Sequence, residues 1–131
     1  MQTPFTVADY MSTKLITVNP ELDILHAGSV LLKHDISGVP VVAMNGELVG
    51  IVTEKDFFRT TIHASYYNQL GGKVSDYMSH EVITVAAKMN ILDTAEMFLK
   101  TKYRRYPVIA DGKLIGLISR RDVLRALHSL C

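Results

Sequence analysis

The 131-residue sequence predicts an α+β fold in which two β-α-β-β-α repeats pack about a pseudo-two-fold axis. Three observations lead to this fold class. The two halves of the chain share many identical residues in the same order. Each half alternates short β-branched runs with amphipathic stretches. One such half has too little core to be stable alone, so the two are expected to bury their sheets against each other.

The repeat is visible by direct comparison. The segment "VADYMSTKLITV" returns as "VSDYMSHEVITV", so Val7 corresponds to Val74 at an offset of 67. One residue is lost in a later turn, and the offset becomes 66 where Gly46 matches Gly112. The predicted boundaries are 5–65 for the first repeat, 66–73 for a linker and 74–131 for the second repeat.

The first half of each repeat reads as a strand followed by a helix. The run "KLITV", residues 14–18, is apolar and β-branched, which predicts a strand. A helix is predicted to follow at residues 19–35, with Asn19 as its cap, Pro20 in its first turn, and Glu21 and Asp23 at its positive end. The equivalent helix in "AAKMNILDTAEMFLKTK" is expected to lack this cap. The expected apolar face of the first helix is Leu22, Leu25, Gly28, Leu31 and Leu32.

The second half of each repeat reads as a hairpin and a closing helix. The hairpin "GVPVVAMNGELVGIVT" turns at Asn45-Gly46, where a positive φ is tolerated, and Asp111-Gly112 serves the second copy. The closing helices are predicted to begin after Thr53 and Ser119. The aromatic run "FFRTTIHASYY" fits either an oligomer face or the core, and the sequence leaves both open.

Composition excludes several classes of protein. The net charge of +1 is too small for a general nucleic-acid binder, although residues 1–65 sum to −3 and residues 66–131 to +4, which leaves room for a local anion site. No apolar run approaches the roughly 18 residues of a membrane span, and the first residues lack the pattern of a signal peptide. We therefore expect a soluble, cytoplasmic protein.

Motifs for catalysis or metal binding are absent from the sequence. The single cysteine, Cys131, excludes an internal disulfide and a cysteine-based zinc site, and the five histidines show no metal-ligand spacing. No G-x-S-x-G, Walker A or G-x-G-x-x-G motif is present. We expect neither an enzyme nor a metal site.

The ordered set "ITV", "GVPVV…G-LVGIVT--D" and "RRYPVI…G-LIGLIS--D" resembles a pair of CBS domains, the repeats named after cystathionine β-synthase. The resemblance covers residues 5–130. It implies a Bateman module, which binds adenosyl ligands such as AMP, ADP, ATP or S-adenosylmethionine in clefts between two repeats. Such modules regulate an effector protein and often form homodimers. We expect this chain to depart from the usual pattern in having no attached effector domain.

The resemblance also implies which residues would contact the ligand. Asp122 is expected on the ribose hydroxyls, Ser119 beside the sugar or phosphate, and Arg104 and Arg105 on phosphates, which the planar arginine fork suits. Free amides at the start of the closing helix could face phosphate oxygens. The complete expected set for this stronger cleft is Thr17, Ile36, Ser37, Arg104, Arg105, Ser119, Arg121 and Asp122.

A second, weaker cleft is expected from the equivalent positions. It is weaker because small, neutral residues replace the two arginines there. Its expected residues are Thr84, Tyr103, Gly38, Thr53, Lys55 and Asp56.

Each of these residues also has a purely structural interpretation. Thr53 with Asp56, and Ser119 with Asp122, approximate a helix capping box, which explains the hydroxyl without a ligand. The arginine pair fits a solvated surface, and Thr17 and Thr84 fit ordinary strand positions. At the level of function, the alternative to ligand binding is a ligand-free scaffold that assembles through its repeats.

Overall fold

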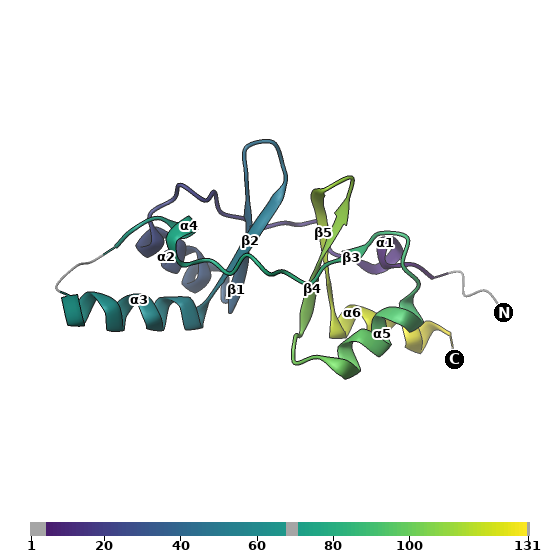
Figure 1. Ribbon diagram of the computed structural model, residues 1–131. Coiled ribbons are helices and arrows are strands. Elements are labelled where there is room, and N and C mark those ends of the chain that lie inside the picture. Colours follow the sequence, from purple (N-terminus) through teal and green to yellow (C-terminus); the bar gives the residue numbers. More distant parts are fainter. Residues whose placement is uncertain (1–4, 68–70, 131) are drawn as a thin grey trace. The chain divides into compact units, whose positions relative to one another are not determined.

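Figure 1 shows the computed structural model of the chain, which describes residues 5–67 and 71–130. Cys131 lies outside the described residues. The α+β class is confirmed, because helices and antiparallel strand pairs alternate along the chain. The chain divides into two compact units, which we call the first-repeat unit, Ile16–Val82, and the second-repeat unit, Met1–Leu15 with Ile83–Cys131.

The first-repeat unit is a β-hairpin covered by two helices. Strands β1 and β2 pair antiparallel with Gly38 opposite Thr53, and helices α2 and α3 contact each other. Helix α3 begins directly after Thr53, as predicted, and continues past the predicted repeat end at residue 65. The elements are α2 (Ile24–His34), β1 (Gly38–Val42), β2 (Leu48–Thr53), α3 (Glu54–Tyr67) and α4 (Val74–Tyr77).

The second-repeat unit has the same plan with one additional short strand. Strand β3 pairs parallel to β4, and β4 pairs antiparallel to β5 with Arg105 opposite Ser119. Helix α6 begins directly after Ser119, as predicted. The elements are α1 (Val7–Tyr10), β3 (Val85–Ala86), α5 (Ile91–Lys100), β4 (Arg105–Ala110), β5 (Lys113–Ser119) and α6 (Arg120–Ser129).

The core of each unit includes a short segment that belongs, by sequence, to the other repeat. Val7, in α1, is fully buried in the core of the second-repeat unit beside Tyr106 and Ile118. Its counterpart Val74, in α4, is fully buried in the core of the first-repeat unit. The two repeats have therefore exchanged their opening segments, which are residues 5–12 and 72–79.

Backbone hydrogen bonds hold both exchanged segments in place. In the second-repeat unit, the N–H of Val7 donates to Met89 O at 2.9 Å, and Ser12 and Leu117 exchange bonds of 2.8 and 3.0 Å. In the first-repeat unit, the N–H of Val74 donates to Leu22 O at 2.8 Å. The compact units therefore do not coincide with the sequence repeats.

One ion pair adds to the contacts of the second exchanged segment. The ammonium of Lys73 lies 2.6 Å from a carboxylate oxygen of Glu21. The hydrogen bond to Glu21, followed by its negative charge, raises the pKa of Lys73. Because both side chains are largely exposed, we expect this pair to contribute little to stability.

The predicted start of the first helix is wrong. Helix α2 begins at Ile24, and its cap is Asp23, whose side chain accepts the N–H of Leu25 at 2.7 Å. Asn19 instead closes a local turn by accepting the N–H of Glu21 at 2.8 Å. The second copy has Ala86 at the position of Asn19, and its helix α5 is capped by Asn90, the counterpart of Asp23, which accepts the N–H of Asp93.

The physical reason for the late start is competition for backbone carbonyls. Pro20 O accepts the N–H of Ser75 and Leu22 O accepts that of Val74, both from the exchanged segment. Residues 20–22 form a turn instead of a helix, so their carbonyls face a neighbouring segment.

Two further expectations need correction. The strand predicted at residues 14–18 is reduced to a single bridge between Val18 and Val41. The predicted apolar face of α2 is rotated, since Leu25 and Leu32 are 52% and 84% exposed. The residues that α2 buries are Ile24, Ala27 and Leu31. The predicted pattern counted every leucine as core, but two of them face outward.

The hairpin turns follow the prediction. Gly46 has φ 90°, and both residues of the second turn, Asp111 and Gly112, have positive φ of 53° and 78°. Such angles favour glycine and tolerate aspartate, which explains the residues found there.

Candidate functional site

The start of helix α6 carries the most concentrated group of predicted site residues. The Ser119 side chain accepts the N–H of Asp122 at 3.0 Å, and a carboxylate oxygen of Asp122 accepts the N–H of Ser119 at 2.9 Å. This reciprocal pair is the capping box that the structural interpretation predicted. The Asp122 side chain stays 17% exposed, and its second carboxylate oxygen lies 3.3 Å from Nη1 of Arg125.

Arginines surround this capping box. Arg105 pairs with Ser119 across the β4–β5 ladder, and Arg104 O accepts the N–H of Arg120 at 2.9 Å. Arg104, Arg105 and Arg121 are exposed. Within the described residues, none of these three guanidinium groups has a hydrogen bond or an ion pair. The arrangement leaves three positive groups near one partly exposed carboxylate.

The equivalent place in the first-repeat unit is built differently. The Asp56 carboxylate accepts both the N–H of Thr53, at 2.6 Å, and its hydroxyl, at 3.1 Å. Its other oxygen pairs with Arg59. Asp56 is only 2% exposed, so its carboxylate is enclosed by its own capping contacts.

We call the groups around these two capping contacts the Asp122 half-site and the Asp56 half-site. They also differ in charge. Ser37 and Gly38 occupy the positions of Arg104 and Arg105, and Ser37 O accepts the N–H of Glu54 where Arg104 O accepts that of Arg120. By sequence, residues 16–82 hold four Lys or Arg and eight Asp or Glu, for −4, while the remaining residues hold ten and five, for +5. An anionic group is therefore favoured by the second-repeat unit.

The structure brings together part of each predicted set. Arg104, Arg105, Ser119, Arg121 and Asp122 of the stronger set gather in the second-repeat unit. Gly38, Thr53, Lys55 and Asp56 of the weaker set gather in the first-repeat unit. The remaining members of each set lie in the other unit. Of the stronger set, the first-repeat unit holds Thr17, Ile36 and Ser37. Of the weaker set, the second-repeat unit holds Thr84 and Tyr103.

These remaining members differ in exposure. Thr17 and Ser37 are exposed, whereas Ile36 is half-buried against the core of the first-repeat unit. Thr84 is half-buried beside β3, and Tyr103 is 51% exposed while its carbonyl accepts from Arg120 Nε at 3.0 Å. The contribution of all five to a ligand site stays a prediction.

The strand residues beside the half-sites belong mainly to the core. Val39, Val41 and Val108 are fully buried. Tyr106 is 1% exposed, and its hydroxyl bonds to Thr101 at 2.5 Å and to Met97 O at 3.2 Å. These strand residues therefore belong to the cores of their units.

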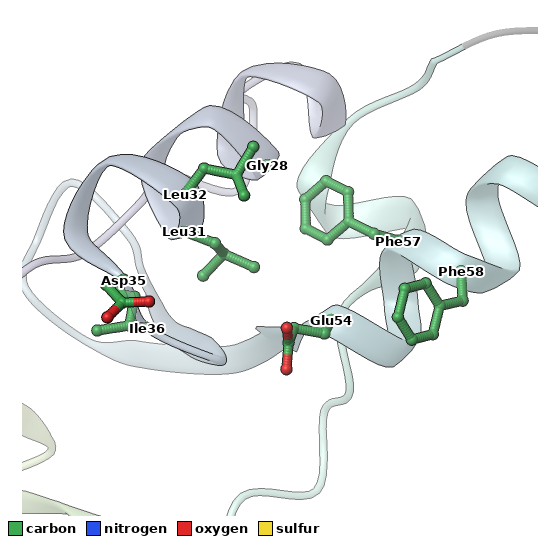
Figure 2. Close-up of a pocket in the computed structure, with 8 residues that line it drawn as sticks. All are labelled: Gly28, Leu31, Leu32, Asp35, Ile36, Glu54, Phe57 and Phe58. Carbon is green, nitrogen blue, oxygen red and sulfur yellow. The ribbon is translucent and has the colours of Figure 1, made fainter.

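A pocket that the sequence did not reveal opens between helices α2 and α3. The hollow has a volume of about 280 Å³. Figure 2 shows the side chains that surround it. Gly28 forms part of its wall, because a Cβ there would lie 2.8 Å from the Phe57 ring. The pocket is mostly apolar, with two carboxylates at its edge. Its lining is Gly28, Leu31, Leu32, Asp35, Ile36, Glu54, Phe57 and Phe58.

The aromatic run in α3, which the sequence left open between core and oligomer face, divides between the core and an exposed helix face. Phe57 packs against the core of the first-repeat unit, whereas Phe58 and Ile62 are 63% and 67% exposed. The signal for this division is helical spacing, since Phe58 and Ile62 are four residues apart and share one face.

Neither metal binding nor membrane insertion has support in the described part of the chain. No three His, Cys, Asp or Glu side chains of residues 5–67 and 71–130 gather in a way that could hold a metal ion. No helix among these residues is both long and apolar enough to span a bilayer.

Comparison with known proteins places this geometry among related folds. The CBS domain family model matches residues 7–62 and again residues 74–129. The chain is 33% identical over 150 residues to the chloroplastic CBS domain-containing protein CBSX1 of Arabidopsis thaliana, covering 93% of this chain and 64% of that protein. It spans only 43% of an uncharacterised Methanocaldococcus jannaschii protein, MJ1225, to which it is 28% identical.

Two solved structures of similar fold contain adenosyl ligands. The crystal structure of CBSX2 in complex with AMP has a TM-score of 0.83 and 34% identity, with 96% of this chain and 98% of that chain covered. The CBS domain pair of protein MJ0100, in complex with 5-methylthioadenosine and S-adenosyl-L-methionine, has a TM-score of 0.74 and 27% identity, with coverage of 96% and 98%.

Proposed function

Since the chain belongs to the CBS-domain family and carries two CBS domains in tandem, we propose that it is a non-catalytic regulatory module that binds an adenine nucleotide or a related adenosyl ligand. The observation that carries the proposal is the Asp122 half-site, where a partly exposed carboxylate lies among three arginines without partners in the described residues. The AMP held by CBSX2 and the adenosyl ligands held by the MJ0100 pair support the ligand class.

Each group of the half-site has a role in the proposal. The Asp122 oxygen that faces Arg125 accepts hydrogen bonds from the ribose hydroxyls, as an acidic residue does in dinucleotide-binding folds. Arg104, Arg105 and Arg121 bind phosphate oxygens, for which the guanidinium fork is well shaped. Ser119 lies beside the sugar or phosphate, and Thr17, Ile36 and Ser37 stay predicted ligand contacts.

The weaker set forms a second place for the same ligand class. Thr84, Tyr103, Gly38, Thr53, Lys55 and Asp56 are its proposed residues. Because Asp56 is almost fully enclosed, a ligand there has to displace a capping contact or do without the carboxylate. We therefore expect the Asp122 site to fill first.

The proposed module acts on an effector protein. The module forms a homodimer, resides in the cytoplasm and passes the ligand signal to an effector protein. Ligand binding shifts an equilibrium between two conformations only as far as the ligand prefers one of them. No resident cofactor is required, because the adenosyl ligand is itself the signal.

The first test removes the charge of Asp122 while keeping an oxygen for the capping bond. Asp122→Asn is expected to weaken AMP binding about ten- to a hundredfold, since a hydrogen bond to a charged group contributes about 1.5–3 kcal/mol. Isothermal titration calorimetry measures the affinity. Asp111→Asn is the matched control, because asparagine tolerates the positive φ of that exposed turn residue. Unchanged affinity in Asp122→Asn would place the ligand elsewhere.

The second test separates phosphate contacts from nucleoside contacts. Arg105→Ala is expected to weaken ATP and ADP by about ten- to a hundredfold and adenosine much less, because the removed contact is charge-assisted. Lys113→Ala, at the far end of the same hairpin, controls for a general loss of positive charge. Equal losses for all three ligands would assign Arg105 a structural role.

A ligand-free scaffold is the second candidate function, and one observation favours it. Large apolar side chains are exposed on the helices of both units, including Leu32 at 84% and Leu99 at 86%. A thermal-shift screen with AMP, ADP, ATP and S-adenosylmethionine decides between the candidates, because a ligand that binds only the folded state raises its stability. No shift with any of the four would favour the scaffold.

A further inference from the structure

The Arg125 side chain contacts two groups that lie 112 residues apart in the chain. Its Nη1 atom is 3.3 Å from the Asp122 carboxylate, and its Nη2 atom donates to Tyr10 O at 3.3 Å. Its guanidinium carbon also lies 5.7 Å from the centre of the Tyr10 ring. Tyr10 is the last residue of α1, so one side chain joins the candidate ligand site to an exchanged segment.

The equivalent residue of the other repeat makes only one of these two contacts. Arg59 pairs with Asp56, as Arg125 pairs with Asp122. Within the described residues, Arg59 has no bond to Tyr77, the counterpart of Tyr10. The Tyr77 hydroxyl instead donates to Gly71 O at 3.0 Å. The chain therefore contains its own control for the bridge.

We infer that Arg125 is a positioning residue that couples Asp122 to the exchanged segment 5–12, so that ligand binding and the docking of this segment strengthen each other. The ligand half of this inference rests on the proposed function. The segment half depends only on the contacts of Arg125 with Tyr10.

The coupling follows from the way the carboxylate is held. One oxygen of Asp122 is fixed by the N–H of Ser119, at 2.9 Å, and the other faces Arg125. The guanidinium is planar and its two terminal nitrogens move together, so a shift of Nη2 away from Tyr10 also moves Nη1 relative to Asp122. Docking of α1 thus orients the carboxylate that the ribose hydroxyls would meet.

Thermodynamic reciprocity then sets the direction of the effect. If the docked segment raises the affinity for ligand, bound ligand stabilises the docked segment by the same factor. The expected size is modest, about threefold, because an exposed ion pair contributes about 0.2–1 kcal/mol.

The first experiment needs no ligand. Hydrogen exchange of the backbone amides of residues 7–12 is compared between the wild-type chain, Arg125→Gln and Arg59→Gln. We expect exchange about threefold faster in Arg125→Gln and unchanged in Arg59→Gln, with the β4–β5 amides reporting that the unit stays folded. Equal exchange rates at residues 7–12 in all three proteins would overturn the inference.

The second experiment tests the coupling by a double-mutant cycle on AMP affinity. Tyr10→Leu removes the ring under the guanidinium but keeps the backbone carbonyl. It is expected to weaken AMP binding about threefold in the wild-type background and to have no effect in the Arg125→Gln background. Equal losses in both backgrounds would show that Tyr10 acts on the fold alone and would overturn the coupling.

A conservative variant and a negative result complete the design. Arg125→Lys keeps a positive charge for Asp122 but offers one ammonium, which cannot hold Asp122 and Tyr10 together, so residues 7–12 are expected to exchange as fast as in Arg125→Gln and AMP binding to stay weaker than in the wild-type chain. Slow exchange in this variant would contradict the two-ended contact. Absence of binding of AMP, ADP, ATP and S-adenosylmethionine to the wild-type chain would overturn the proposed function and the ligand half, whereas the exchange experiment still decides the contact with Tyr10.

Discussion

Residues at the helix starts carry side-chain oxygens that accept free backbone N–H groups. Asp23 does so for α2, Asn90 for α5 and Ser119 for α6, at 2.7, 2.9 and 3.0 Å. The first N–H groups of a helix have no partner within the helix, so each cap satisfies a donor that would otherwise need water. At Ser119 the same cap orients the Asp122 carboxylate of the candidate site.

Replacing the cap of α2 tests this argument at a single residue. Asp23→Ala is expected to lower the free energy of unfolding by about 1 kcal/mol, because the N–H of Leu25 loses its acceptor. Asn19→Ala is the control, since Asn19 serves a turn outside the helix and we expect a smaller loss. Urea unfolding followed by circular dichroism measures both. A larger loss in Asn19→Ala would contradict the observed helix start.

Among the elements, the exchanged segments depend on close backbone approach to the hairpins. Gly116 lies under Met11 and Ser12, where a Cβ would be 2.6 Å from Met11 Sδ and 3.0 Å from Ser12 O. Gly50 has the same position under the other segment, with Ser79 O at 2.8 Å from a Cβ. These glycines leave the space in which each exchanged segment pairs with β5 or β2.

Filling this space should loosen the segment. Gly116→Ala is expected to lower the free energy of unfolding by about 1–3 kcal/mol, the usual cost of inserting a methyl group into a packed site. Gly38→Ala is the control, because its Cβ would meet a side-chain methyl of Thr53 at 3.3 Å rather than an exchanged segment. Thermal melts compare the two variants. A Gly116→Ala variant as stable as Gly38→Ala would show that the segment has room to move.

For the molecule as a whole, the exchange makes the two compact units depend on each other's sequence. The core of the second-repeat unit needs Val7, and the core of the first-repeat unit needs Val74. Burying one valine contributes about 1.5–3 kcal/mol, a large share of the 5–15 kcal/mol that stabilises a typical domain. Neither contiguous repeat contains a complete unit.

Cutting the chain between the repeats tests this dependence. The polypeptides 1–67 and 71–131 each lack an exchanged segment that their core requires, so neither alone is expected to unfold cooperatively at the temperature of the intact chain. Mixing the two is expected to restore cooperative melting, as followed by far-ultraviolet circular dichroism. A separate 71–131 polypeptide that melts like the intact chain would show that α1 is dispensable.

The sequence by itself determined the repeated α+β plan, the turns at Gly46 and Gly112, and the helix starts after Thr53 and Ser119. It also placed Arg105 and Ser119 at the two ends of one hairpin, although the register shift between Val108 and Ile109 that sets them opposite each other was not predicted. The predicted features all depend on residues close in the chain, where spacing and backbone preference suffice.

Only the tertiary structure decided into which unit each opening segment packs. The segments "VADYMS" and "VSDYMS" differ at one position, and the two units that receive them share one plan, so the local pattern fits either arrangement. The exchange in turn fixed the start of α2, because the carbonyls of Pro20 and Leu22 bond to the incoming segment. The contact of Arg125 with Tyr10 follows from the same exchange, because Tyr10 reaches Arg125 only when segment 5–12 packs in the second-repeat unit.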